Sequence, residues 1–254
     1  MPRMSRQRSE SGYYHVMIRG NNKKDIFKKD EEKERFFEII KKNKSENKWR
    51  LRAYCIMNNH AHLLIEECEY EINQIMKKIN VSYAMYYNKK YKITGHVFQD
   101  RYKSEVVADD TYLLVLMRYI HQNPIKAGMV KNIKDYKWSS YNEYIGKATE
   151  KITDIDIIEI FSKNKKEAIE GFKAFHKEND DNTYLEDKEE TLKKKKKRAW
   201  KMIEDRLNKS AASKKELAEL LLKNTKLPQR RIAEMLEINR GAVQRIGSKL
   251  KDQE

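Results

Sequence analysis

The chain has 254 residues, enough for one domain of ordinary size and a smaller second one. Its formal net charge is +16, and so large a positive surplus causes self-repulsion unless a polyanion screens it. Nucleic acid is therefore the first candidate partner, and an anionic membrane surface is the second. No apolar run approaches the roughly 20 residues of a membrane-spanning helix, and residues 1–14 lack the apolar stretch of a signal peptide. Cys55 and Cys68 alone build neither a disulfide framework nor a zinc finger, so we expect a cytoplasmic, nucleoid-associated protein.

Strand and helix patterns alternate over the first part of the chain. Residues 13–19 alternate as a short strand, which ends at the turn residues Gly20-Asn21-Asn22. Next come a helix over 30–47, strands over 49–57 and 60–66, a helix over 72–91, a loop leading into a strand over 97–107, and a helix from about 109 to 123, which Pro124 stops. Short strands interleaved with helices predict an α+β fold, an antiparallel sheet with helices on one face, over roughly 13–146.

The C-terminal part is helical and is interrupted by a composition break. Residues 155–176 predict one or two helices that lie near the sheet, while 177–198 is too charged to bury much apolar surface. That segment is a linker or a solvated helix, and its run "KKKKKR" is either a phosphate-binding patch or an exposed helix face. The sequence thus divides into a sheet domain over 1–150, a helical extension and charged linker over 151–198, and an all-α module over 199–254.

Two histidines interrupt the apolar strand pattern of "NNHAHLLIE". On a strand, residues two apart share a face, so His60 and His62 project together and can converge on one divalent ion. If Asn58-Asn59 forms a two-residue turn, Cys55 lies opposite His62. Two alternatives stay open: the histidines are ordinary polar strand residues, or Cys55 joins them in a zinc site that still lacks a fourth ligand.

A tyrosine on the following helix is the candidate nucleophile. Tyr119 and Asn123 are one helical turn apart, so the phenol and an amide oxygen can face the same point in space. A tyrosine oxygen can attack phosphorus and form a phosphotyrosine that keeps the energy of the broken bond, while a nearby cation polarises the phosphate. The alternative is that Tyr119 is simply a half-buried helix aromatic.

The motifs "NNHAHLLIE", "GHVFQDRYKS" and "RYIHQNPIKAG", in this order, resemble those of the REP-associated tyrosine transposases, insertion-sequence-200-type members of the single-tyrosine HUH family. The resemblance implies a ferredoxin-like, RRM-like sheet over about 13–146. It implies that His60 and His62 bind Mg²⁺ or Mn²⁺, that Asn123 completes the coordination, and that Tyr119 attacks single-stranded DNA. The products would be a 5′-phosphotyrosine and a free 3′-hydroxyl.

The same resemblance implies a single-stranded or hairpin DNA partner, bound by a monomer or a homodimer. Arg19, Arg101 and Lys103 lie in the matching motifs and are candidate phosphate contacts. Tyr102 either stacks on a base or packs inside the protein. The remaining histidines of this region are expected to be structural or adjacent to the substrate: His15, His96 and His121.

Residues 229–248 fit a helix-turn-helix, with Glu237 at the turn position where glycine is commoner. The second helix would begin near Arg240 and present Arg240, Gln244 and Arg245 to a groove of duplex DNA. The alternative is a three-helix bundle that binds protein or nothing.

Two functions compete on this basis. The first is a metal-dependent single-strand DNA endonuclease and strand transferase that acts through Tyr119. The second is a non-catalytic, helix-turn-helix DNA-binding regulator with a decayed nuclease domain. A replication initiator or relaxase of the same superfamily is a third possibility, but no phosphate-binding GxxxxGK[ST] loop of a helicase is present.

Overall fold

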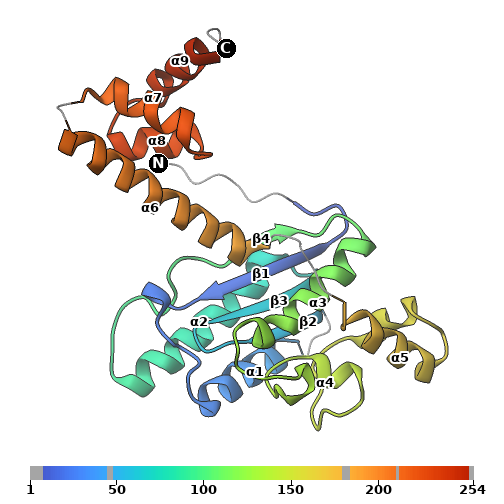
Figure 1. The fold of residues 1–254 in the computed structure, drawn as a ribbon. Coiled ribbons are helices and arrows are strands. Elements are labelled where there is room, and N and C mark those ends of the chain that lie inside the picture. Colours follow the sequence, from blue (N-terminus) through green and yellow to red (C-terminus); the bar gives the residue numbers. More distant parts are fainter. Residues whose placement is uncertain (1–7, 45–47, 179–183, 210–211, 252–254) are drawn as a thin grey trace. The chain divides into compact units, whose positions relative to one another are not determined.

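A computed structural model of the chain describes residues 8–44, 48–178, 184–209 and 212–251. The chain divides into two compact units, Met1–Asn182 and Thr183–Glu254. The first unit holds the sheet and the second is built of helices alone within the described residues (Figure 1). Across those residues, no helix combines the length and apolarity needed to cross a membrane.

The first unit is organised around one antiparallel sheet of four strands in the order β2-β3-β1-β4. The elements follow the chain as β-α-β-β-α-β, and the predicted α+β class and antiparallel sheet are confirmed. The strands are β1 (Tyr13–Arg19), β2 (Trp49–Ile56), β3 (His60–Glu67) and β4 (Lys103–Val106). A short 3₁₀ turn, Asn21–Lys23, follows β1.

The hairpin between β2 and β3 has the register that the two-residue turn predicts. The Met57 amide donates to the His60 carbonyl at 2.8 Å, and Cys55 lies opposite His62. Because opposed residues in an antiparallel pair point to the same face, His62, Cys55 and Ala53 share one face of the sheet. We call it the histidine face.

Two helices cover the other face, as the sequence predicts. Helix α1 (Asp30–Lys44) packs beside α2 (Ile72–Tyr91), with acidic residues in the first turn of α1, where they complement the helix dipole. Between them the rings of Phe27, Phe36 and Tyr83 have centroids 4.8 to 5.3 Å apart. The buried Tyr83 hydroxyl donates to the Ile26 carbonyl, so this aromatic cluster carries no unpaired phenol.

Helix α3 (Asp110–Lys126) lies on the histidine face, so the helices do not all lie on one side as predicted. The physical reason is that this face is also apolar: Met17, Ala53, Cys55 and Leu64 are all buried. A sheet with two apolar faces needs cover on both. The Asp109 side chain caps the start of α3 by accepting from the Tyr112 amide at 2.7 Å.

The end of α3 differs from the sequence prediction, because the helix continues past Pro124 to Lys126. Proline removes one backbone donor, which costs little in a last turn whose other bonds are kept. The amides of Ala127 and Met129 donate to the carbonyls of Asn123 and Pro124. Gly128, with φ of 68°, ends the helix in the left-handed conformation that glycine adopts readily.

The rest of the first unit wraps the outer edge of β2. The Ile56 amide donates to the Trp138 carbonyl and the Ser140 amide to the Tyr54 carbonyl, so this edge of the sheet is partly covered. The segment includes the 3₁₀ turns Ile133–Asp135 and Ile155–Ile160 and the helices α4 (Tyr141–Tyr144) and α5 (Lys165–Phe175), which bears out the helices predicted over 155–176.

The second unit consists of α6 (Leu185–Lys209), α7 (Lys214–Asn224), α8 (Gln229–Leu236) and α9 (Arg240–Lys251). Its core gathers Ala199 and Ile203 of α6 with Leu221, Ile232 and Val243 of the later helices. Helix α6 runs through the domain boundary suggested at 198/199, because its Lys, Glu and Leu residues favour a helix. The predicted helical character of 199–250 is confirmed, with breaks between the four helices.

Candidate active site

The histidine pair lies on the central part of the sheet, as its alternation predicts. His60 and His62 leave β3 on the same face, with ring centroids 4.9 Å apart and ring planes at 90°. His62 is fully buried and His60 is 6% exposed. Two imidazoles this close are near enough for one small ligand to contact both.

Helix α3 brings the predicted nucleophile to this pair from nearly sixty residues further along the chain. The Tyr119 ring lies edge-on to His62, with centroids 5.6 Å apart, and 6.1 Å from the ring of His15. Tyr119 is 2% exposed. One turn on, the buried Asn123 donates from Nδ2 to the Tyr119 carbonyl at 2.9 Å, which leaves Oδ1 as the atom of this amide that can bind a cation.

Hydrogen bonds to the other ring nitrogen orient both histidines. His60 Nδ1 lies 2.6 Å from Asn59 Oδ1, which only accepts, so the proton belongs on Nδ1 and the lone pair on Nε2. His62 Nδ1 lies 2.9 Å from Nε2 of His15, and the two rings are stacked with centroids 5.2 Å apart. When His62 is the donor, its Nε2 is also a lone-pair ligand, the arrangement common among metal-binding histidines.

The chemistry of these donors fits a divalent cation with nitrogen and oxygen ligands. Two imidazoles and one amide oxygen leave coordination positions for water or phosphate oxygens. A zinc site with Cys55 fits less well, because burial raises the pKa of the Cys55 thiol and disfavours the thiolate that zinc requires. Within the described ranges, no three His, Cys, Asp or Glu side chains gather as a metal-binding group.

The structure separates the three predicted phosphate contacts of this unit. Arg19 lies opposite His60 in the β1–β3 register, and Lys103 lies opposite Met17, so both belong to the histidine face. Arg101 does not: it lines a separate cavity of about 650 Å³ beside α2. Tyr102 is buried and packs inside the protein.

Two further side chains complete the surroundings of Tyr119: His15, which was expected to be structural or adjacent to the substrate, and Lys126, which the sequence did not single out. His15 contacts both His62 and Tyr119, and the Nζ of Lys126 lies 4.8 Å from the centre of the Tyr119 ring. The alternation of residues 13–19 puts His15 on the face of Arg19, but only the pairing of β1 with β3 reveals its neighbour. Lys126 lies seven residues after Tyr119, two turns along α3, a spacing that could have identified it.

His121, on the same helix, belongs to a different cluster, as its predicted position off the Tyr119 face implies. His176 Nδ1 donates to the Phe172 carbonyl at 2.8 Å, so its Nε2 accepts from His121 Nδ1 at 2.9 Å. His121 Nε2 in turn accepts from the Ser140 hydroxyl at 2.7 Å. Burial lowers the pKa of His176 to about 3 and the pKa of His121 well below its ordinary value. This neutral chain ties α5 to α3.

The contact between His15 and His62 predicts unequal effects of two substitutions. His15→Leu removes the acceptor that faces His62 Nδ1, which should cost about 1–3 kcal/mol in the free energy of unfolding. His15→Gln, whose amide oxygen can accept at the same place, should recover most of that loss in urea unfolding. The ¹⁵N shifts of His62 should report a proton on Nδ1 in the wild type and the Gln variant only. Equal unfolding midpoints for the two variants would contradict this role.

The buried His121–His176 chain predicts a loss of stability in acid. The folded pKa of His176, about 3, is below its unfolded value of 6.5, so its stabilising neutral form is fully present above pH 6.5. As the pH falls from 6.5 towards 3, the unfolded state takes up the proton first, and stability drops by up to about 1.4 kcal/mol per pH unit. Urea unfolding at pH 8 and pH 5 measures this, and His176→Gln should reduce the difference. An unchanged difference in that variant would argue against the assignment.

Two solved structures are similar to part of the chain. A REP-associated tyrosine transposase bound to a REP hairpin is 16% identical, covers 62% of this chain and 96% of its own, and has a TM-score of 0.48. A Deinococcus radiodurans protein described as a transposase is 17% identical, covers 48% of this chain and 97% of its own, and has a TM-score of 0.34.

Sequence comparison finds a similarity that is confined to the sheet unit. A Haemophilus influenzae protein assigned as a REP-associated tyrosine transposase is 30% identical over 105 residues, which cover 35% of this chain and 57% of that relative. The family model described as "Transposase IS200 like" matches residues 8–123, from the segment before β1 to Asn123. The match includes both histidines and Tyr119. Residues 8–123, somewhat less than half of the chain, are thus similar to the IS200-like transposases, and the chain spans little more than half the length of the Haemophilus influenzae relative.

Proposed function

We propose that this protein is a metal-dependent endonuclease and strand transferase for single-stranded or hairpin DNA, with Tyr119 as its nucleophile. The observation that carries the proposal is the position of the Tyr119 ring, whose centroid lies 5.6 Å from that of His62, which in turn lies 4.9 Å from the ring of His60. The match of residues 8–123 to the model described as "Transposase IS200 like" supports a transposase-type reaction on DNA. The β-α-β-β-α-β order and the strand order β2-β3-β1-β4 support a ferredoxin-like fold for this unit.

The proposed reaction exchanges one phosphodiester for another. The phenol oxygen of Tyr119 loses its proton and attacks phosphorus, the P–O bond to the 3′ oxygen breaks, and that oxygen leaves as a 3′-hydroxyl after protonation. The 5′ side stays attached as a phosphotyrosine, which retains the bond energy for a later attack by another 3′-hydroxyl. Lys126, whose ammonium lies 4.8 Å from the phenol ring, adds positive charge where negative charge develops.

His60 and His62 would hold the proposed Mg²⁺ or Mn²⁺ through Nε2, and Asn123 would add Oδ1. A cation bound there supplies positive charge beside the non-bridging oxygens of the phosphate. The chain contributes orientation: Asn59 and His15 fix the rings of the two histidines through Nδ1. Arg19 and Lys103, on the same face, are the proposed contacts for the flanking phosphates.

We propose that α8 and α9 form a helix-turn-helix that binds duplex DNA. Glu237 joins them with φ of 52° and ψ of 50°, the left-handed conformation that explains why glycine is commoner at such turns. Arg240, Gln244 and Arg245 of α9 are all exposed, as recognition residues must be. Asn239 supports the start of α9 by accepting from the Gly241 amide at 2.7 Å.

The second candidate function is a DNA-binding regulator that has kept the nuclease fold without its chemistry. The exposed polar face of α9 is consistent with both functions, because a helix-turn-helix would bind DNA in the regulator and in the enzyme alike. The enzyme is the better proposal because His60, His62 and Tyr119 are all present and lie together.

The covalent intermediate provides the sharpest test of the nucleophile. We expect the wild type to form an adduct with labelled single-stranded hairpin DNA from the flanks of its gene when Mn²⁺ is present. Tyr119→Phe should abolish the adduct and change hairpin affinity less than about threefold, because it removes one hydroxyl from a face bound mainly through phosphates. A denaturing gel measures the adduct.

Tyr112→Phe is the matched control, because it removes a phenol hydroxyl from the same helix, seven residues before Tyr119. It should keep the adduct, and a chelator should abolish the adduct in both proteins. An adduct that survives Tyr119→Phe or the chelator would refute the nucleophile or the cation, respectively. Duplex binding without any adduct would favour the regulator.

The α9 face predicts a separable defect. Replacing Arg240, Gln244 and Arg245 together by Ala should lower the affinity for a selected duplex site at least tenfold, since each good base contact contributes about 1–3 kcal/mol of discrimination. The yield of adduct with a short single-stranded oligonucleotide should stay at the wild-type level. Electrophoretic mobility shift and the adduct gel measure the two effects. Unchanged duplex affinity would mean that α9 is not a recognition helix.

A further inference from the structure

Six lysines line one cavity of the first unit at the C-terminal end of α3. The cavity has a volume of about 670 Å³, and we call it the lysine cleft. Its lysines come from α3, from the segment after it, from the region after α4, and from α5 and its end: Lys126, Lys131, Lys134, Lys147, Lys173 and Lys177. All six lie beyond Asn123, the last residue of the family match, so the IS200-like assignment does not account for them.

The charge of the lysine cleft is poorly compensated. No Asp or Glu is among the residues that line it. Lys173 pairs with Glu170 at 2.7 Å, whereas Lys131, Lys134 and Lys147 form no ion pair within the described residues. These three are exposed. Folding has therefore gathered like charges that repel one another, an arrangement that an anionic ligand stabilises.

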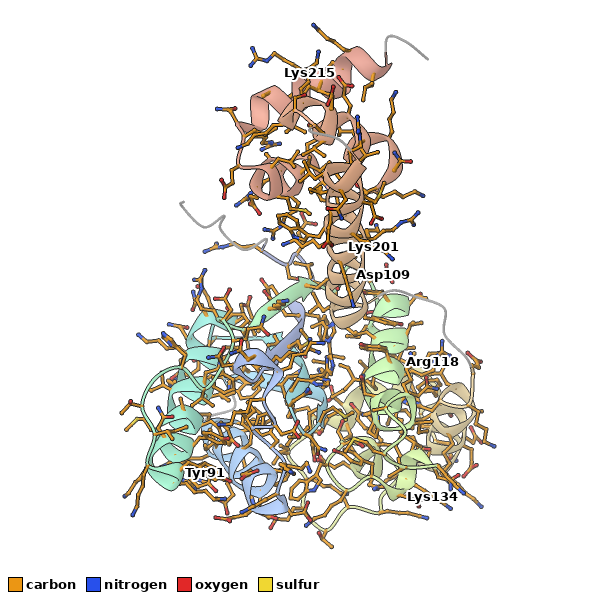
Figure 2. The ribbon with its side chains drawn as sticks, turned by 60° about the vertical axis from the view of Figure 1, so that its left-hand side comes forward. Tyr91, Asp109, Arg118, Lys134, Lys201 and Lys215 are labelled. Carbon is orange, nitrogen blue, oxygen red and sulfur yellow. The ribbon has the colours of Figure 1, made fainter. Side chains whose placement is uncertain are left out.

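The lysine cleft adjoins the candidate nucleophile. Lys126 lines it, and the Nζ of the same residue lies 4.8 Å from the centre of the Tyr119 ring. Figure 2 shows how α3 leads towards the lysine cleft: the helix runs from Asp109 past Arg118, and Lys134, a residue of the cleft, lies beyond its far end. Tyr91, at the end of α2, lies on the opposite side of this unit in the same view.

We propose that the lysine cleft binds the phosphates of the DNA that flanks the phosphodiester attacked by Tyr119. The inference rests on the proposed function and extends it to a binding surface outside the sheet. DNA is the expected ligand because the lysines are spread over several segments on the far side of Lys126 from Tyr119. The phosphates of a DNA strand are likewise spread along the strand on either side of the cleaved phosphodiester. Each lysine that meets a phosphate releases counterions, so the cleft gives affinity and position without sequence selectivity.

The test compares two variants of equal charge. The cleft variant carries Lys131→Gln, Lys134→Gln, Lys147→Gln and Lys177→Gln. The control variant carries Lys28→Gln, Lys29→Gln, Lys89→Gln and Lys92→Gln, four exposed lysines on the side of α1 and α2. Both are made in the Tyr119→Phe background, and fluorescence anisotropy measures their affinity for a hairpin with long single-stranded flanks over a range of salt concentrations.

The cleft variant should bind at least about tenfold more weakly at 0.15 M salt, and the slope of log affinity against log salt should fall by about 3 to 4. The control variant should change both by much less. The difference should shrink as the flanks are shortened, because fewer phosphates then reach the cleft. Equal losses in the two variants, or no dependence on flank length, would overturn the proposal.

This binding comparison does not depend on catalysis. Failure of the otherwise wild-type protein to form an adduct with any oligonucleotide would refute the proposed chemistry and leave the comparison of the two variants valid. Circular dichroism and urea unfolding of both variants show whether either substitution set disturbs the fold. A cleft variant that folds normally and binds long flanks like the control would refute the lysine cleft alone.

Discussion

The antiparallel register of β1 with β3 is the constraint on which the site depends. It sets Arg19 opposite His60 and brings His15 within hydrogen-bonding distance of His62. A slip of one residue would turn every side chain of β1 to the other face, and His15 would enter the apolar layer beneath α1 and α2. Burial of both faces therefore fixes the register, and the register fixes the positions of the imidazoles. The fold and the candidate chemistry are specified by the same pairing.

Local patterns predicted most of the fold, and the errors arose where distant parts of the chain decide. Alternation located the strands, and Asn58-Asn59 gave the register of the hairpin. The sequence could not show that α3 covers the histidine face, because that depends on which apolar surface stays uncovered after α1 and α2 have packed. Pro124 was taken as the end of α3, but the bonds made by the amides that follow it let the helix continue to Lys126.

The part of the site that depends on sequence motifs and on the spacing of residues along one strand or helix was predictable. Same-face spacing paired His60 with His62, and the family resemblance selected Tyr119 among fifteen tyrosines. Lys126 was missed, and His15 was given only as structural or adjacent to the substrate, because the contacts of both residues depend on neighbours in space that the sequence does not show. Arg101 lies in the same motif as Lys103, yet only Lys103 belongs to the histidine face, since residues outside a regular strand lose the alternation that would place them. The lysine cleft was harder still to predict, because its six lysines are spread over some fifty residues of the sequence.

The near-complete burial of Tyr119 bears on the fate of the proposed intermediate. A phosphotyrosine can be resolved by a DNA hydroxyl, which rejoins strands, or by water, which leaves a permanent break. With 2% of its surface exposed, the Tyr119 ring offers solvent little approach from the protein side. Side chains above it must move aside for a strand to enter, and the entering strand then occupies the space that water would use. The buried surroundings of Tyr119 would thus favour attack by a DNA hydroxyl, which rejoins the strands, over hydrolysis, which leaves a break. A more open pocket would admit water and lose this preference.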